Sequence, residues 1–269
     1  MAQYVAALSI AGSDCSGGAG IQADIKTMSA LGVYAATAIT AITVQDGFGV
    51  IKVDPVSADT VSQQIMAVMK YITPKAVKIG MLCNRQIVEA VSAALSHFND
   101  VPIIVDPVIA ASDSSPLIDE EAIPVFKECI LPMATLITPN IPESHILSGE
   151  YEDMDKVAST LLDFCNTILI KGGHSDNPDT ACDMLYSRGG YVRRYEAPRL
   201  VSENTHGTGC TLSSAIAAYV AMGYSLQQAC DKAKEYMSMA IDQGRDVAFP
   251  QGSHGPLNHF FNPKPIIKL

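Results

Sequence analysis

Two glycines and a cysteine occur together where a helical pattern begins, in the segment Thr205-His206-Gly207-Thr208-Gly209-Cys210-Thr211. The glycines allow a ligand to approach the backbone closely, and the unpaired N–H groups of a first helical turn favour an anion such as a phosphoryl group. The helix dipole also predicts a lowered pKa for Cys210, which could then act as a base or nucleophile. The alternative is a small buried cysteine without a chemical role, because cysteine is among the most buried residue types.

A second glycine-rich segment, Gly12–Gly20, follows a strand predicted at Val5–Ala11. It lacks the Gly-Lys-[Ser/Thr] ending of a P-loop. Its last part, Gly18–Ala23, fits the G-x-G-x-x-G/A pattern of dinucleotide-binding folds, with Asp46 after the second strand as the acidic partner. Six residues separate the first strand from the first glycine of this pattern, whereas the turn of a dinucleotide-binding fold is tight. Dinucleotide binding is therefore the less favoured alternative.

Three further polar segments each follow a strand-like apolar run: Asp106-Pro107, Asn140-Ile141-Pro142-Glu143 and Lys171-Gly172-Gly173-His174. Ligands of open α/β sheets bind at the carboxyl ends of the strands, so the two acids are candidates for Mg²⁺, directly or through water. A lysine beside two glycines suits a phosphate clamp. Taken singly, the proline-containing pairs are ordinary turn formers, and the lysine could be a solvated loop residue. Together with the helix start at Gly207, these segments predict one site at one edge of one sheet.

Strand-like and helical patterns alternate along the chain, which is typical of a mostly parallel sheet built from βαβ units. The strands after the first are predicted at Ala38–Val44, Ala76–Gly80, Pro102–Val105, Thr135–Thr138 and Thr167–Ile170. Helical periodicity between them places, for example, Ile21, Ile25, Met28 and Leu31 on one buried face.

The rhythm changes at Asp183–Glu196, where two runs around a Ser-Arg-Gly-Gly turn predict an antiparallel hairpin at the sheet edge. Two helices are then predicted at Cys210–Met222 and Leu226–Ile241. We expect a single α/β domain over residues 1–269.

Composition excludes several classes of protein. Hydrophobic residues make up 48% of the 269 residues, and no apolar run approaches the roughly 18 residues that span a bilayer. The net charge of −10, without a basic block, disfavours a nucleic-acid partner. The seven cysteines include no C-x-x-C pair, which predicts neither a disulfide framework nor a zinc knuckle. No basic signal region precedes the first strand, so we expect a cytoplasmic protein.

The segments described so far, with a few others, resemble the hydroxymethylpyrimidine/phosphomethylpyrimidine kinases of thiamine biosynthesis, a branch of the ribokinase superfamily. The matching segments are Ala11–Asp24, Thr37–Gln45, Lys78–Leu82, Asp106–Val108, Thr138–Glu143, Lys171–His174, Thr205–Ser214 and His254–Phe260. They span nearly the whole chain in the family's order, and the last two are quite specific to this branch. The resemblance implies a three-layer α/β/α ribokinase-like fold, a homodimer and MgATP as the phosphoryl donor. It also implies phosphorylation of 4-amino-5-hydroxymethyl-2-methylpyrimidine and then of its monophosphate to the diphosphate.

The resemblance further implies a role for each matching residue. At the substrate, Gln45 would hydrogen-bond the aminopyrimidine edge, Met81 and Val108 would pack against its ring, and Gly12 and Asp24 would lie nearby. Gly207, Thr208 and Gly209 would form an anion hole beside Cys210, which stands where most ribokinase relatives have a catalytic aspartate. Lys171 would neutralise the transferred phosphate. ATP would be bound by Asn140, Glu143, Lys171, Thr205, Gly207 and Gly209. Mg²⁺ and its waters would be organised by Asp106 and Glu143. Asp24 and His206 could instead serve only to hold their loops.

One departure concerns residues 108–117, where the family often has a glycine in a flap over the substrate and this chain has none. The departure bears on the mobility of the flap and not on the chemistry. This flap also lacks the second cysteine of some related pyridoxal kinases. Pyridoxal kinase activity is nevertheless the alternative function, because pyridoxal carries a hydroxymethyl group like the pyrimidine.

Overall fold

A nine-stranded sheet runs through the computed structural model, which describes residues 2–46, 49–111, 115–172, 179–190, 192–200, 202, 204–249 and 255–268. In chain order, its strands are β1 (Ala6–Asp14), β2 (Tyr34–Gln45), β3 (Val50–Pro55), β4 (Ala76–Ile79), β5 (Ile103–Val105), β6 (Leu136–Ile137), β7 (Thr167–Ile170), β8 (Thr180–Ser187) and β9 (Val192–Pro198). They lie in the order β3-β2-β1-β4-β5-β6-β7-β8-β9. The six neighbouring strands β2, β1, β4, β5, β6 and β7 are parallel, whereas the edge strands β3, β8 and β9 pair in an antiparallel way.

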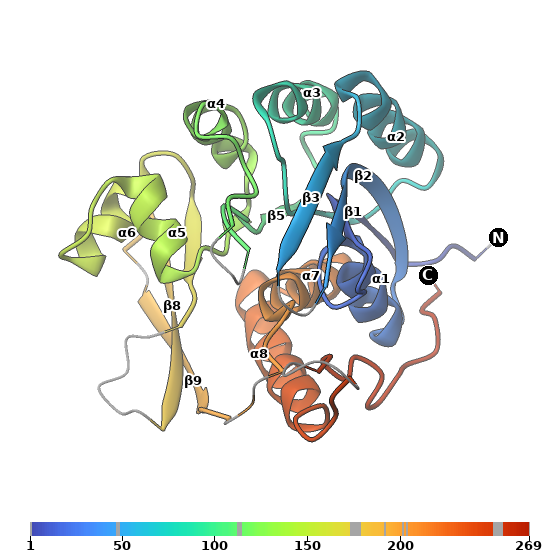
Figure 1. Ribbon diagram of the computed structural model, residues 1–269, viewed down its shortest axis with the longest axis vertical. Coiled ribbons are helices and arrows are strands. Elements are labelled where there is room, and N and C mark those ends of the chain that lie inside the picture. Colours follow the sequence, from blue (N-terminus) through green and yellow to red (C-terminus); the bar gives the residue numbers. More distant parts are fainter. Residues whose placement is uncertain are drawn as a thin grey trace.

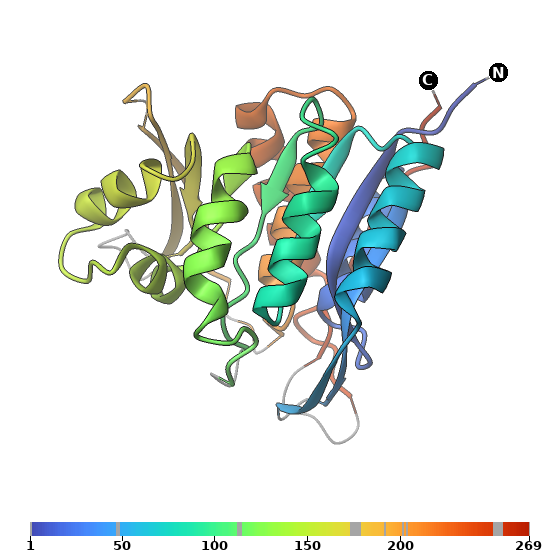
Figure 2. The same cartoon turned by 90° about the horizontal axis from the view of Figure 1, so that it is seen from above.

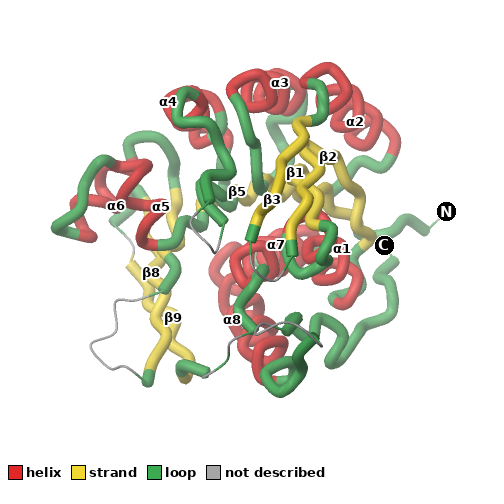
Figure 3. Tube along the Cα trace, viewed as in Figure 1, coloured by secondary structure: helices red, strands yellow, loops and turns green. Residues whose placement is uncertain are grey.

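Helices cover both faces of this sheet and complete a three-layer α/β/α fold (Figures 1 and 3). One face carries α2 (Ala58–Tyr71), α3 (Arg85–Leu95), α4 (Ala122–Cys129), α5 (Ile141–Ser148) and α6 (Met154–Leu162). The other face carries α1 (Gly20–Ala30), α7 (Thr208–Ala221) and α8 (Leu226–Asp242). The predicted fold class, including the edge hairpin β8–β9, is therefore confirmed.

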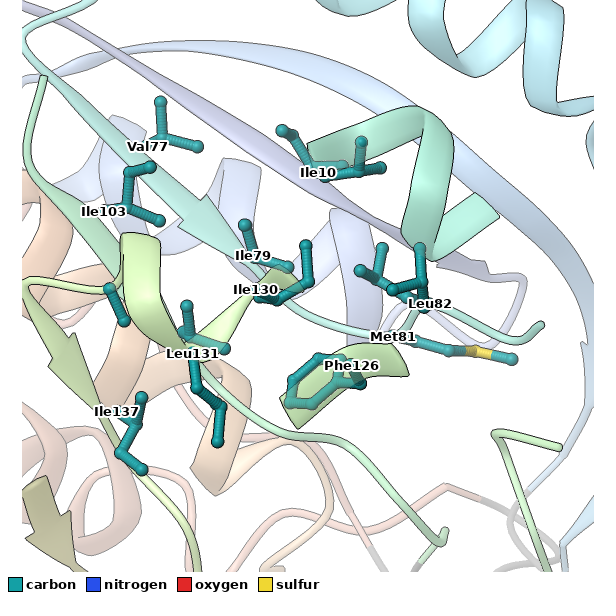
Figure 4. Packing of buried hydrophobic residues seen from close by; sticks show 14 of the residues in the cluster. Ile10, Val77, Ile79, Met81, Leu82, Ile103, Phe126, Ile130, Leu131 and Ile137 are labelled. Carbon is teal, nitrogen blue, oxygen red and sulfur yellow. The ribbon is translucent and has the colours of Figure 1, made fainter. Parts of the chain in front are cut away.

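Each central strand contributes to two hydrophobic cores, because successive side chains of a strand point to opposite faces. Val77 and Ile79 of β4 belong to the core under α2 to α6, whereas Ala76 belongs to the core under α7 and α8. Figure 4 shows the first of these cores, in which Phe126 and Leu131 face the strand side chains. A sheet covered on both faces needs apolar residues without alternation, which explains the continuous apolar runs of the sequence.

Three details differ from the sequence-based expectations. β3 was not predicted, because its side chains are exposed or half-buried and no hydrophobic pattern marks it. β3 pairs with the second half of β2. The strand β2 itself begins at Tyr34 and not at Ala38 as predicted. Both strands reach past the helical layer at one end of the molecule (Figure 2). Ile25 was expected on the buried face of α1 but is 38% exposed, so that prediction was wrong.

The sheet topology indicates where a ligand would bind. The chain order reverses at β1, because β2 lies on one side of β1 and β4 on the other. In open α/β sheets, the crevice outside the carboxyl ends of the strands at such a reversal is the usual ligand site. Helix α7 packs across β1, β4 and β5, so its position on the sheet brings it to this crevice.

Candidate active site

A pocket of about 240 Å³ lies at the carboxyl ends of the parallel strands and at the start of α7. All predicted site residues except Asp24 line it: Gly12, Gln45, Met81, Asp106, Val108, Asn140, Glu143, Lys171, Thr205, Gly207, Thr208, Gly209 and Cys210. They come from the carboxyl ends of parallel strands and the segments that follow them, and from the starts of α5 and α7. The expected meeting of these segments at one sheet edge is therefore observed, while the role of each residue stays a prediction.

The start of α7 is shaped by glycine. Gly207 precedes the helix with a φ of 81°, a left-handed conformation that favours glycine. A methyl group there would collide with the carbonyl oxygen of Gly18, so the two glycine-rich loops lie directly against each other. No side chain in the described part of the chain caps this helix start. The N–H of Thr208 donates to the carbonyl oxygen of Thr205 at 3.2 Å, whereas no hydrogen bond among the described residues involves the N–H groups of Gly207 and Gly209, which are thus available to an anion.

An ion pair faces this helix start. Nζ of Lys171 lies 2.7 Å from Oδ1 of Asp106, and Asp106 also accepts hydrogen bonds from Thr138 and Ser213. A methyl group on Gly209 would lie 3.2 Å from Nζ of Lys171 and 3.5 Å from Oδ2 of Asp106. The helix start, the lysine and the carboxylate therefore border the same small space.

The charges of this pair support each other. Burial would raise the pKa of Asp106, but Lys171 and Lys78 together hold it below its ordinary value. Burial would likewise lower the pKa of Lys171, but Asp106 and Glu143 raise it above its ordinary value. Both side chains are charged at neutral pH, as a phosphate site requires.

Glu143 is fixed by a helix cap. Its backbone N–H donates to Oδ1 of Asn140, and the N–H of Asn140 donates to Oε2 of Glu143, each at 2.8 Å. This capping box follows from the Asn-Ile-Pro-Glu pattern at the start of α5. Burial raises the pKa of Glu143 to about 7, with Lys171 opposing the rise and Asp106 adding to it.

Asp106 and Glu143 fit Mg²⁺ as a site that keeps water ligands. Within the described ranges, no cluster of three His, Cys, Asp or Glu side chains is arranged to hold a metal. Mg²⁺, however, is usually held by one or two carboxylates together with substrate phosphates and waters. Glu143 is buried, and burial raises the pKa of its carboxyl group, so the positive charge of a divalent cation would favour its ionised form.

The predicted lowering of the pKa of Cys210 was wrong. Burial raises the pKa of this thiol to about 11; Lys78 opposes the rise, and Asp24 and Asp106 add to it. The helix start is present as expected, but desolvation and two nearby carboxylates outweigh it. Cys210 is half-buried in the pocket lining, and its thiol is protonated at neutral pH in the unliganded protein.

The assignment of Asp24 to substrate binding also needs correction. Asp24 is 0% exposed and lies outside the pocket lining, where it forms an ion pair with Lys78 at 2.9 Å. Lys78 itself lines the pocket, although the sequence reading gave it no role. The signal that could have revealed it is a lysine within the otherwise apolar run Ala76–Gly80.

A second residue without a predicted role, Asp14, joins the two glycine-rich loops. Nε2 of His206 lies 3.1 Å from Oδ2 of Asp14, and the N–H of Ala19 donates to the same oxygen at 2.7 Å. Burial would raise the pKa of Asp14, but hydrogen bonds from His206 and Gln45, among others, lower it below its ordinary value. His206 therefore holds the loop before α7 against the loop before α1, one of the roles that the sequence left open.

Part of the pocket lining is apolar. Met81 and Val108 belong to it, and a methyl group on Gly12 would lie 2.9 Å from the sulfur of Met81. Gln45, at the end of β2, also lines the pocket and is half-buried. Apolar side chains together with one amide suit a flat ring with a polar edge.

The C-terminal matching segment contacts the start of α7 through His259. Its Nε2 lies 3.0 Å from Oγ1 of Thr211, and burial, with a contribution from Lys26, lowers the pKa of His259 to about 4. The sequence reading quoted this segment without giving His259 a role. Gly173, His174, His254 and flap residues 112–114 lie outside the described residues.

An uncapped glycine-rich helix start, a lysine paired with one carboxylate, and a second carboxylate are the parts that small-molecule phosphotransfer needs. Within a three-layer α/β/α fold with this strand order, these features define a phosphotransferase of the ribokinase-like class. Comparison with known proteins gives the particular family. The model of the phosphomethylpyrimidine kinase family matches residues 14–258, and the chain belongs to this family.

Relatives and solved structures agree with this membership. The hydroxymethylpyrimidine/phosphomethylpyrimidine kinase of Rhizobium meliloti is 42% identical over 94% of this chain and 96% of its own length. The thiamine biosynthesis bifunctional protein ThiED of Geobacter sulfurreducens is also 42% identical, and this chain spans 51% of its length. The phosphomethylpyrimidine kinase of Clostridium difficile has a TM-score of 0.77 at 38% identity, covering 88% of this chain and 99% of that one. Bacillus subtilis pyridoxal kinase, in an ADP complex, has a TM-score of 0.84 at 33% identity, covering 96% and 98%.

The family match decides against the dinucleotide-binding alternative for Gly18–Ala23. In addition, none of the helices in the described segments combines the length and apolar character needed to cross a membrane.

Proposed function

We propose that this chain transfers the terminal phosphoryl group of ATP to the hydroxyl group of 4-amino-5-hydroxymethyl-2-methylpyrimidine, and then to the phosphate of the resulting monophosphate. The observation that carries this proposal is the meeting of the α7 start, the Lys171–Asp106 pair and Cys210 in one pocket of a family member. The names of the relatives from Rhizobium meliloti and Geobacter sulfurreducens, which refer to this kinase and to thiamine biosynthesis, support the same substrate and pathway.

In this proposal, the transferred phosphoryl group lies against the N–H groups of Gly207, Thr208 and Gly209, with Lys171 facing it across Gly209. Phosphoryl transfer depends mainly on alignment and charge stabilisation, which backbone dipoles and one lysine can supply. Thr205 and Asn140 line the same part of the pocket and would contact the ATP phosphates.

Asp106 and Glu143 would hold Mg²⁺ through its waters, and the bound ion would neutralise phosphate charge. Asp106 is kept ionised by Lys171 and Lys78, so it is ready to do this. Burial raises the pKa of Glu143 to about 7, and a bound divalent cation would favour the ionised form of this carboxyl group.

The acceptor ring would pack against Met81 and Val108, with Gly12 leaving room for it. Gln45 would hydrogen-bond the amino group and ring nitrogen of the pyrimidine. Cys210, which lines the same pocket, would take the proton of the acceptor hydroxyl group.

The test is direct. The purified protein is incubated with MgATP and the hydroxymethylpyrimidine, and ADP, the monophosphate and the diphosphate are separated and quantified. Formation of both phosphates is the expected result. If a protein that still binds MgATP forms neither the monophosphate nor the diphosphate, the proposal is refuted.

A pyridoxal kinase activity is the second candidate, and the high structural similarity to the pyridoxal kinase of Bacillus subtilis favours testing it. The same assay with pyridoxal gives kcat/KM for each ring. We expect the pyrimidine to have the higher value. The homodimer implied by the resemblance and the cytoplasmic location expected from the composition are also proposals, and sedimentation of the purified protein tests the homodimer.

A further inference from the structure

A fully buried ion pair lies directly behind the pocket. Lys78 of β4 and Asp24 of α1 are both 0% exposed, and Nζ of Lys78 lies 2.9 and 3.0 Å from the two carboxylate oxygens. The pair lies on the face of the sheet where neighbours such as Ala76 and Ile104 are apolar. Removing two charges from water costs several kcal/mol per ion, and replacing such a pair by apolar residues is often neutral or stabilising. Stability therefore does not explain this pair.

Asp24 fixes the position of Lys78 relative to α7. Its carboxylate accepts hydrogen bonds from Ser9 of β1 and from Ser214 of α7, the latter at 2.6 Å. Ser214 follows Cys210 by four residues, so the two side chains lie on the same face of the helix. One carboxylate thus joins α1, β1, β4 and α7 at the point where the first turn of α7 meets the pocket.

Lys78 and Cys210 both line this pocket. We propose that Lys78, held in place by Asp24, is a positioning residue whose positive charge stabilises the thiolate of Cys210 during phosphoryl transfer. This inference rests on the proposed function, in which Cys210 takes the proton of the acceptor. The side chain of Lys78 borders the pocket but is 0% exposed to solvent and is paired with Asp24, so it is placed to act through Cys210 and not by direct contact with the substrate.

The proposed step moves one proton and one phosphoryl group. The thiol of Cys210 first releases its proton to solvent. The proton of the acceptor hydroxyl group then moves to the thiolate sulfur while the acceptor oxygen forms a bond to the γ-phosphorus. The bond between that phosphorus and the bridging oxygen of ATP breaks, and ADP leaves with the electron pair.

The charged groups around Cys210 show why one lysine matters. Asp24, Asp106 and burial all disfavour the thiolate, whereas Lys78 favours it more than the N–H of Gly20 does. Lys171 also interacts electrostatically with Cys210, but it is paired with Asp106 at 2.7 Å. Without Lys78, two carboxylates would act on the thiol with little opposition.

The test uses alkylation of Cys210 by iodoacetamide between pH 7 and pH 10, without substrate. The rate is followed by mass spectrometry of the peptide that contains Cys210, because the chain has seven free cysteines. In Lys78→Met, we expect alkylation of Cys210 to slow about threefold to tenfold at each pH. A rise of about one unit in the pKa of Cys210 lowers the thiolate fraction about tenfold, and the slightly higher nucleophilicity of that thiolate offsets part of this loss. Lys75→Met is the matched control, because Lys75 is an exposed lysine just before the same strand. In Lys75→Met, Cys210 should be alkylated at the wild-type rate.

Kinetics give a second readout. With Lys78→Met, kcat should fall at least tenfold while KM for ATP and for the pyrimidine changes less than twofold. If the unpaired Asp24 prevents folding, the double variant Asp24→Asn/Lys78→Met removes both charges and replaces the single variant. It should show the same slower alkylation to a smaller degree, because the influence of Lys78 on Cys210 exceeds that of Asp24.

The two proposals fail in different ways. A folded variant lacking Lys78 that is alkylated at the wild-type rate overturns this inference, whether or not the wild type is a kinase. A wild type that forms no phosphorylated pyrimidine refutes the proposed function, and the alkylation profiles still decide the influence of Lys78 on the thiol.

Discussion

Gly209→Ala separates catalysis from stability at the start of α7. Gly209 is in the first turn of this helix, so alanine fits its backbone and should favour the helix by up to about 1 kcal/mol. The added methyl group would lie 3.2 Å from Nζ of Lys171, which Asp106 holds in place at 2.7 Å, and 3.5 Å from Oδ2 of Asp106. It would therefore occupy the space in which the phosphoryl group is proposed to lie, or displace the lysine by a few tenths of an ångström.

Misplacing or losing one contact of this kind costs roughly 10²–10³ in rate. We therefore expect kcat for the pyrimidine to fall by about 10²-fold, while the free energy of unfolding changes by no more than about 1 kcal/mol. A coupled assay of ADP release gives the first quantity, and denaturant unfolding gives the second. Gly189→Ala is the control, since Gly189 lies in the β8–β9 turn with its nearest contact at 3.8 Å. If Gly209→Ala keeps wild-type turnover, the phosphoryl group does not lie between α7 and Lys171.

Three further substitutions test other parts of the site. Cys210→Ala should lower kcat by about 10²–10⁴-fold, the usual contribution of a general base, and leave the Kd for ATP unchanged in a calorimetric titration; full activity would show that the thiol is only structural. Gln45→Ala should raise KM for the pyrimidine more than KM for ATP, and equal KM values in mutant and wild type would remove Gln45 from the substrate site. The pKa of His259 is lowered from 6.5 to about 4 in the folded protein. Between these two pH values the unfolded state therefore binds more protons than the folded state. The neutral ring contributes stability that is fully present above pH 6.5 and is lost as the pH falls to 4. Between pH 7 and pH 4, the free energy of unfolding in urea should therefore fall by roughly 2–3 kcal/mol less for His259→Asn than for the wild type. An equal fall in both proteins would contradict the low pKa of His259.

Much of the fold was available from the sequence because it depends on local chemistry. Continuous apolar runs such as those at Val5–Ala11 and Thr167–Ile170 mark strands that are buried on both faces of the sheet. β3 escaped prediction because an edge strand with exposed side chains needs no hydrophobic pattern; its stability comes from pairing with β2.

The segments of the pocket were equally visible, because each polar segment directly follows a strand end and all parallel strands end at the same edge. The sequence by itself therefore determined that Asp106, Glu143, Lys171 and the start of α7 would meet. It also placed a glycine at position 207, where the structure has a left-handed backbone, but the close contact with Gly18 comes from the tertiary structure.

Only the tertiary structure decided the charge states and partners of these groups. The pKa of Cys210 depends on burial and on Asp24, Asp106 and Lys78, which are distant in the sequence and close in space. The pairing of Asp24 with Lys78 likewise joins a helix to a strand 54 residues away. Local patterns specify backbone shape, whereas the ionisation of a side chain is set by the solvent and charges around it, and these exist only once the chain has folded.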